Sequence, residues 1–284
     1  MRLQRDHYEG TAFDLTTDKA SGPYGNPDRY ATGSAGADGQ FERAISLFRT
    51  AYSYVTQASA LDPRLGVVWF GPYAPHATTY VPIYARVEAT PDATARGSLR
   101  RFDNRTLFWA NAIVGNYGGL FYKLTSPVIR AASGAYEAAA LAGTTLSFIV
   151  ETIMLRLAHA AVAAQIATLS DADAVTCLTQ TSADAAARAL ASATALFATL
   201  VTHFHDGYVV SNTTADEMGI APMGYPQWWL RSVGYNYNDG NQIQVVAGAL
   251  MGAALTIVVL GVAAGFAVGR YIALKQPSIQ RVKA

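Results

Sequence analysis

The order of apolar and polar residues predicts a sheet-rich part followed by a helical part. Residues 1–40 are rich in Gly, Asp, Pro and Ser, which is typical of loops. Aromatic and β-branched residues are frequent in 43–57, 67–70 and 79–87, which predicts three strands. Because Pro82 cannot donate a backbone hydrogen bond, we expect the last of these strands at a sheet edge or a bulge.

The middle of the chain, residues 106–206, is predicted to be mainly helical. Ser126 followed by Pro127 is typical of a helix start, since serine caps and proline fits the first helical position. Ser170 is expected to cap a second, alanine-rich helix over 171–206. An aromatic segment, 207–235, completes the predicted domain 1–235, whose sheet-rich part is 1–105.

A long apolar segment near the C-terminus predicts a membrane span. Residues 245–269 are 25 residues without a charge. At about 1.5 Å per residue they cover roughly 37 Å, more than the hydrocarbon core of about 30 Å. A long core helix is the alternative, but it would need protein on every side. We therefore predict a juxtamembrane linker at 236–244, a transmembrane helix at 245–269 and a basic tail at 270–284.

The charges around this span predict its orientation. The tail carries four basic residues, whereas the linker carries only Asp239, so the tail is expected in the cytosol and the large domain in a lumen or outside. Two glycosylation sequons lie on that same side, at Asn104 and Asn212. Glycines four residues apart would allow two spans to approach closely in a homodimer. These glycines are Gly248, Gly252, Gly261, Gly265 and Gly269.

Composition narrows the class of protein. The net charge is +1, and the basic residues form no long run, which argues against a nucleic-acid partner. Charged residues make up 14%, against about 25% in an average soluble domain, in keeping with a membrane segment. The first six residues lack the apolar core of a signal peptide. A signal sequence lost from upstream would reconcile this start with the predicted orientation.

Several short aromatic, Gly- and Pro-rich blocks occur in a fixed order and resemble the cysteine-dependent dipeptidases of the N-terminal-nucleophile hydrolase superfamily, the C69 or U34 peptidases related to the secernins. The blocks are RDHYEGT at 5–11, GPYGNP at 22–27, RTAYSYVTQ at 49–57, VWFGPYAPH at 68–76, YVPIY at 80–84, FWAN at 108–111 with the nearby Asn116, and GYPQWWL at 224–230.

This resemblance implies an α+β fold, part of the αββα nucleophile-hydrolase sandwich, and hydrolysis of dipeptides without a metal or organic cofactor. Members of the family attack with an N-terminal cysteine whose own α-amino group moves the proton. Here residue 1 is Met, and the single cysteine is Cys177. Cys177 is expected on a helix as a small buried residue rather than as a reactive thiol. The chain is therefore interpreted either as the C-terminal part of a longer dipeptidase or as a degenerate paralogue.

The resemblance also gives candidate site residues. Asn116 could contact the scissile carbonyl as an oxyanion donor, or it could be a turn asparagine. Arg5, Asp6 and His7 could bind a terminal carboxylate or amine of the substrate, although structural salt bridging explains them equally well. His76 could line the substrate site or lie in a surface loop.

His203 and His205 are two residues apart at a predicted helix end and so face different ways, and no metal site is expected there. The leading function is a membrane-anchored dipeptidase. The alternatives are a non-catalytic binding or scaffold protein on the same domain and, third, a membrane-assembly subunit associating through the glycines.

Overall fold

The structure, a computed structural model, describes most of the N-terminal part of the chain. It divides into two compact units, Met1–Trp229 and Leu230–Ala284. The described residues are 1–30, 42–60, 62–142, 162–211 and 219–235.

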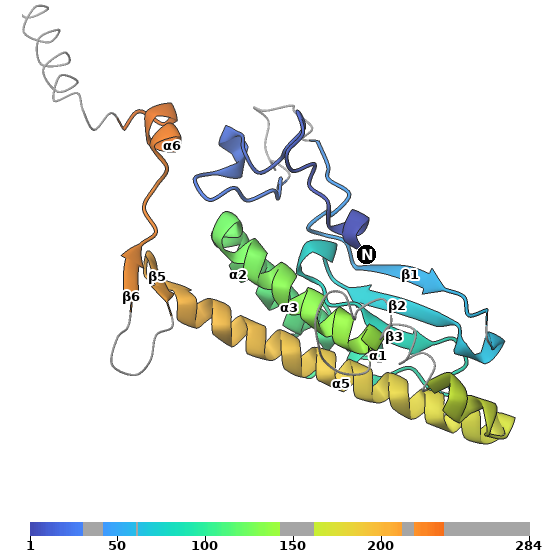
Figure 1. Cartoon of the computed structure of the whole chain (residues 1–284). Helices are drawn as coiled ribbons and strands as arrows, with labels where there is room; N and C mark the ends of the chain where they lie inside the picture. The colour runs from blue at the N-terminus through green and yellow to red at the C-terminus, as the bar shows by residue number, and fades with distance from the viewer. Residues whose placement is uncertain (31–41, 61, 143–161, 212–218, 236–284) are drawn as a thin grey trace, which may run out of the picture. The chain divides into compact units, whose positions relative to one another are not determined.

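A three-stranded antiparallel sheet forms the first layer of unit 1 (Figure 1). Its strands are β1 (Tyr52–Gln57), β2 (Val67–Pro72) and β3 (Val81–Tyr84), in the order β1-β2-β3. All three predicted strands are confirmed: the first and third are shorter than predicted, and the second extends two residues further, to Pro72. Pro82 lies in the edge strand β3, opposite Trp69, as its missing backbone donor predicts.

The first strand begins later than the sequence pattern predicts. Residues 43–51 form turns rather than strand, because their backbone groups bond within the segment and to the N-terminal loop. The amide of Thr50 donates to the carbonyl of Leu47 at 3.0 Å, and the amide of Ser46 donates to the carbonyl of Asp6 at 3.1 Å. This segment therefore ties the sheet to the chain start instead of extending β1.

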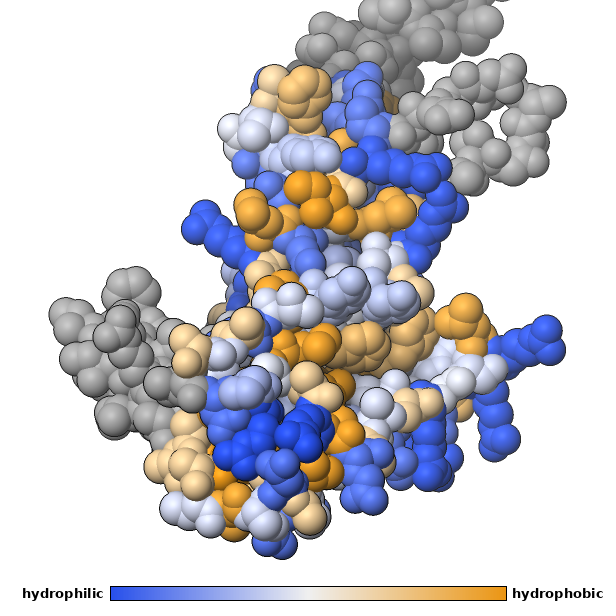
Figure 2. Space-filling model, turned by 90° about the vertical axis from the view of Figure 1, so that its right-hand side faces the viewer, coloured by the Kyte–Doolittle hydropathy of each residue, from blue (hydrophilic) through white to orange (hydrophobic). Residues whose placement is uncertain are grey.

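One face of the sheet packs on the helices, and the other carries exposed aromatic residues. In β1 exposure alternates, so that Tyr52 and Tyr54 are exposed while Val55 packs against the core. Tyr52 stacks on Phe70 of β2, with ring centroids 5.8 Å apart. Figure 2 shows one side of the molecule, on which apolar residues are interspersed with hydrophilic ones.

Helices form the second layer. They are α1 (Asp92–Ala95), α2 (Leu107–Leu120), α3 (Tyr122–Ala142) and α5 (Asp171–His203), and residues 162–167 are also helical. The short helix α6 (Gln227–Ser232) follows later in the chain, across the boundary of the two units, and is not part of this layer. The 3-10 helices are η1 (Arg2–Arg5), η2 (Lys19–Ser21), η3 (Pro63–Leu65) and η4 (Pro75–Ala77). The fold of the described residues is thus mixed α and β, as predicted.

The helix predicted to start at Ser126 begins earlier, and Pro127 lies inside α3. The chain breaks instead at Phe121 (φ −134°, ψ 43°), between α2 and α3. Pro127 stands in the second turn of α3, where its missing N–H leaves the carbonyl of Lys123 without an i−4 bond. The hydroxyl of Thr125 donates to the carbonyl of Gly118 at 2.7 Å and so satisfies an acceptor at the end of α2.

The long helix α5 packs along α2 and β3 through small side chains. Ser170 caps it as predicted, accepting a bond from the amide of Asp173. Ala185, Ala189 and Ala193 are all but fully buried against Val81 and other apolar residues, which allows a close approach between elements.

α5 ends at His203 and not at residue 206 as predicted, because the chain turns there into a second antiparallel sheet. Its strands are β4 (Phe204–His205), β5 (Tyr208–Ser211) and β6 (Gly219–Pro222). Asp206 and Gly207 form the tight turn between the first two strands, with φ of 51° and 79°. Left-handed backbone at both positions is what a two-residue hairpin with this sequence requires.

The predicted membrane span at 245–269, its glycines, the basic tail and Asn212 lie outside the described residues. Within the described part, α5 is long and apolar enough to cross a membrane, by length and composition only. A core helix of a soluble domain meets the same criterion, and one face of α5 packs on the rest of unit 1.

Candidate functional site

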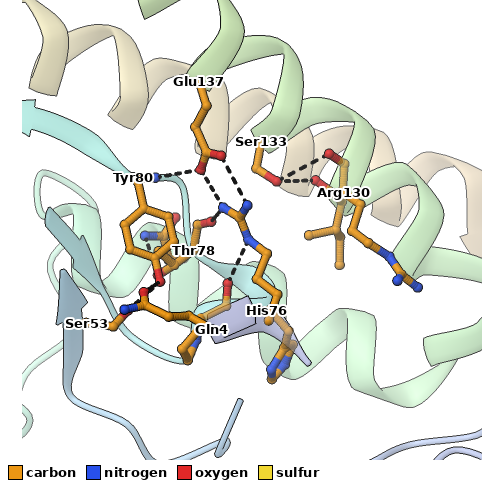
Figure 3. Close-up of polar contacts among 12 residues, drawn as sticks. Gln4, Ser53, His76, Thr78, Tyr80, Arg130, Ser133 and Glu137 are labelled. Atoms are coloured by element: carbon orange, nitrogen blue, oxygen red, sulfur yellow. Dashed lines mark hydrogen bonds and ion pairs between the residues drawn. The ribbon is translucent and has the colours of Figure 1, made fainter. Parts of the chain in front are cut away.

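Arg5, the last residue of η1, lies in a buried polar cluster with Glu137 of α3 and the backbone of η4. Figure 3 shows Glu137, Tyr80 and Thr78 around this cluster. Its guanidinium forms a bidentate ion pair with Glu137, with one contact, Nη1 to Oε2, at 3.1 Å. Nε donates to the carbonyl of Pro75 at 3.1 Å and Nη2 to that of Thr78 at 2.8 Å. These contacts use four of the five N–H donors of the guanidinium, which favours the structural interpretation of Arg5 over binding of a substrate carboxylate.

Glu137 holds the other side of this cluster. Its carboxylate also accepts the backbone N–H of Tyr80 at 3.0 Å, and Tyr80 is completely buried. The Tyr80 hydroxyl hydrogen-bonds Ser53 of β1 at 2.6 Å. Helix α3, the sheet and the chain start are therefore joined by one charged network. The sequence signal for Glu137 was its position as the single charge among residues 131–150.

His7 and His76 lie side by side beneath Tyr122. Their ring centroids are 4.9 Å apart, and Nδ1 of His7 is 2.9 Å from the Tyr122 hydroxyl. Nδ1 of His76 is 3.0 Å from the hydroxyl of Ser46, which also accepts the backbone N–H of His76 at 3.0 Å. His7 is fully buried and His76 is 8% exposed, so the surface-loop interpretation of His76 is wrong.

Both imidazoles are held neutral by their surroundings. Burial lowers the pKa of His7 to about 4, against smaller opposing effects led by the Ser46 backbone. Burial, followed by the charges of His7 and Arg5, lowers the pKa of His76 to about 3. Nε2 of His7 has no hydrogen bond of good geometry among the described residues. These rings pack the interior and titrate far below neutral pH.

Asp6 has a local structural role. Its carboxylate accepts the backbone N–H of Tyr8 at 2.7 Å. Tyr8 has a φ of 62°, an uncommon conformation for a bulky residue. The bond from Asp6 holds that turn, and of the three adjacent candidates only Arg5 and His7 join the buried cluster.

Asn116 lies apart from this cluster, exposed on α2. Its Nδ2 donates to the Tyr73 hydroxyl at 3.0 Å and to the carbonyl of Ala112 at 2.7 Å. Both amide hydrogens are thus occupied, which disfavours a direct oxyanion role. The Tyr73 hydroxyl accepts from Asn116 and keeps its own proton for another acceptor. Burial raises the pKa of Tyr73, so this proton stays in place.

Tyr73 itself is held in a strained backbone conformation, with a φ of 80°. Such a residue costs on the order of 1–3 kcal/mol and persists only when its neighbours fix it. Its amide donates to the carbonyl of Ala51 at 2.9 Å, while Asn111 donates to the preceding carbonyl, Pro72, at 3.0 Å. Gly115 makes room for the ring, because a Cβ there would lie 2.5 Å from Tyr73 Cε1.

Asp28 lies in the N-terminal loop, two residues after Asn26, which contacts the same face of α2. Its amide donates to the side chain of Asn26 at 2.9 Å, and Asn26 lies against Gly119, one helical turn from Gly115. Asp28 is half-buried, and burial raises its pKa to about 6 although the Arg29 charge lowers it. Among the described residues no hydrogen bond or ion pair reaches its carboxylate.

Asp28, Tyr73 and Asn116 together form what we call the α2 patch: an unpaired carboxylate, a hydroxyl donor and an amide oxygen. Of the three, only Asn116 was a candidate from the sequence. Asp28 directly follows the block GPYGNP, and Tyr73 stands in the block VWFGPYAPH. The Gly-Pro pair before Tyr73 could have indicated a turn and thus the unusual backbone conformation of this tyrosine. No sequence pattern shows that a carboxylate has no partner in the folded protein.

Cys177 lies in the first half of α5 and is partly buried against a core cluster that contains Leu178 and Tyr84. Its carbonyl accepts the hydroxyl of Thr181 at 2.8 Å, as in an ordinary helix turn. The predicted position of Cys177 on a helix is confirmed, but its side chain is only partly buried and not buried as predicted.

Comparison with known proteins gives one finding about the family. Residues 2–134 match the sequence model of peptidase family C69. The match contains Arg5, the histidine pair and the α2 patch, whereas Cys177 and the block at 224–230 lie beyond it. A search of curated proteins gave no match.

Proposed function

Because residues 2–134 match the peptidase family C69 model, we propose that this chain carries part of a cysteine-type dipeptidase that hydrolyses dipeptides. The family match is the observation on which this proposal rests. The position of the strained Tyr73 and the unpaired Asp28 within the matched region supports it, since such features gather at functional sites.

The nucleophile in this proposal is not Cys177. A cysteine that uses its own amine as the base must stand at a chain terminus, whereas Cys177 is bonded on both sides within α5. We therefore place the attacking thiol outside these 284 residues. The sheet β1-β2-β3 and helices α2, α3 and α5 would then be part of the αββα sandwich of such hydrolases.

A second candidate is a non-catalytic binding or scaffold protein on the same domain. Arg5, His7 and His76 support it, because their polar groups bond within the domain rather than facing a substrate. Binding of a panel of dipeptides to the purified chain, measured by isothermal titration calorimetry, separates the two, because hydrolysis by this chain alone is expected in neither case. Saturable binding of dipeptides favours the dipeptidase domain, and no binding at millimolar concentration favours the scaffold.

The membrane anchor at 245–269 and the orientation of the domain, away from the cytosol, belong to the same proposal. Asn104 supports it in one respect, because it is exposed just before α2 and so leaves room for a glycan. The predicted contacts of the dimer glycines are tested by crosslinking the span with and without Gly252→Leu and Gly265→Leu.

Expression in a eukaryotic membrane system tests the orientation through Asn104. We expect a glycan on the wild-type chain that a peptide N-glycosidase removes, and we expect Asn104→Gln to lose one glycan unit in gel mobility. Asn212→Gln is the matched variant for the second sequon. A chain that is membrane-bound but carries no glycan at either asparagine would contradict the lumenal placement.

A further inference from the structure

Residues 219–235 form a segment that is exposed and almost uncharged. They include strand β6 and helix α6, and Arg231 is their single charged residue. Ile220 in β6 is 53% exposed, Tyr225 in the following turn is 58% exposed, and Trp228 in α6 is 39% exposed. None of the residues of α6 is buried. Apolar side chains that gather in this way on a surface indicate an interaction site.

The fold holds this segment in place although its side chains face solvent. The amide of Met223 donates to the carbonyl of Gly207 at 2.8 Å, which ties the segment to the turn between β4 and β5. The ring of Tyr225 packs against that of Tyr24 in the N-terminal loop, with centroids 5.7 Å apart. Because these contacts order the segment in advance, a partner would bind it at a small further cost in entropy.

The hairpin of β5 and β6 adds to this surface. Tyr208 lies opposite Pro222, and Val210 lies opposite Ile220, so these four residues share one face of the hairpin. Tyr208 is 44% exposed and Pro222 is also exposed. Neither strand contains a charged residue. The face therefore offers apolar and aromatic area without a charge that would have to be desolvated.

The chain itself brings a bilayer close to this segment. Only the linker 236–244 separates Tyr235 from the proposed membrane span, which begins at Val245. The extended chain from Tyr235 to Val245 covers at most about 36 Å. An inserted span therefore keeps the segment near the lipid headgroups at a high effective concentration. Tryptophan and tyrosine are the residues that gather at the interface between hydrocarbon and water.

Resting on the membrane anchor of the proposed function, we infer that segment 219–235 lies on the bilayer, with Ile220, Tyr225 and Trp228 in the headgroup interface. Arg231 alone contributes little attraction to anionic lipids, so the contact depends on the burial of apolar area and forms on zwitterionic phosphatidylcholine. A second attachment besides the span then limits how unit 1 can turn relative to the membrane.

The test is the tryptophan fluorescence of the full chain in phosphatidylcholine vesicles, with and without bromine on the lipid acyl chains near the headgroup. Bromine quenches tryptophans that lie in the interface. The four tryptophans are Trp69, Trp109, Trp228 and Trp229. We expect Trp228→Phe with Trp229→Phe to lose most of the wild-type quenching, because Trp69 is only 2% exposed in the core. Trp109→Phe is the matched control and should keep the wild-type quenching.

A second variant tests the contact while both reporter tryptophans remain. Ile220→Asp places a charge in the proposed interface, and we expect it to reduce the quenching of Trp228 and Trp229. Thr56→Asp adds the same charge to the exposed strand β1 and should leave the quenching unchanged. Circular dichroism should show the wild-type helix and strand content in both variants. Quenching that is equal in Ile220→Asp and the wild type would overturn the inference.

The anchor and the contact fail in different ways. A chain that floats with the vesicles in a density gradient, but whose tryptophans brominated lipid does not quench, would overturn the inference and leave the anchor standing. Quenching that persists in Trp228→Phe with Trp229→Phe would do the same. Tryptophans shielded from aqueous iodide yet not quenched by the lipid would mean that protein covers the segment, which also overturns the inference. A chain that does not float with the vesicles would overturn both.

Discussion

Arg5→Ala is expected to lower the free energy of unfolding by about 3–5 kcal/mol, because it leaves the carboxylate of Glu137 buried without its partner. The two side chains are 14% and 9% exposed, so water cannot replace the lost contacts. The same change removes the donors to the carbonyls of Pro75 and Thr78. Chemical denaturation of the purified chain measures the effect.

Arg105→Ala is the matched control for this prediction. Arg105 also pairs with an aspartate, Asp103, at 2.8 Å, but its side chain is 81% exposed. Exposed pairs contribute about 0–1 kcal/mol, so its loss should be small. Arg5→Met combined with Glu137→Met should recover much of the stability lost in Arg5→Ala, because no unpaired charge is then buried. A loss below about 1 kcal/mol for Arg5→Ala would contradict the structural role of this cluster.

Acidification is expected to destabilise the protein through His7 and His76, and the effect should begin near pH 6.5. The unfolded rings titrate near 6.5, whereas the folded rings have pKa values of about 4 and 3. Between these values the unfolded state binds more protons, so the free energy of unfolding falls as the pH falls. The loss should reach the order of a few kcal/mol by pH 4.

Other charges around the pair modify this dependence without reversing it. For His7 the charge of Arg130 acts with burial, while those of Asp6 and Asp14 oppose it. Asp28 works in the opposite direction, because its raised pKa makes the folded state gain a proton below about pH 6. The two histidines together should outweigh this single group.

The measurement is the free energy of unfolding as a function of pH, compared with a variant carrying His7→Gln and His76→Gln. This variant should be less stable at neutral pH and should show a flatter dependence between pH 6.5 and 5. His203→Gln with His205→Gln, at the end of α5 and in β4, is the control and should keep the wild-type slope. If the variant with His7→Gln and His76→Gln kept the wild-type pH dependence of the free energy of unfolding, the buried rings would not be the cause of the acid sensitivity.

Much of the fold followed from local sequence patterns. The three strands, the edge position of Pro82 and the cap at Ser170 depend on neighbouring residues, and the structure contains them. The first residue of α3 could not be predicted in this way. A proline indicates that a helix begins nearby, but it does not show whether the proline stands in the first or the second turn. The burial of His76 depends on Ser46 and His7, which are distant in sequence.

The candidate site was predictable only in part for the same reason. The buried ion pair joins residues 5 and 137, and local sequence patterns cannot predict a contact between residues so far apart in the chain. Asn116 was a candidate because it lies near a block that resembles the family. Its hydrogen-bond partner Tyr73 could not be predicted, because the position of Tyr73 depends on the strained turn after β2. That the Asp28 carboxylate has no partner among the described residues is a property of the folded surroundings, so sequence alone could not have found it.

Hydrolysis of L-alanyl-L-alanine by the wild-type chain and by Cys177→Ser, each with and without iodoacetamide, tests the central claim most directly. We predict that neither the substitution nor the reagent changes the rate, because the only sulfhydryl present lies within a helix and has no adjacent free amine. Turnover by the wild type that disappears in Cys177→Ser would contradict this prediction.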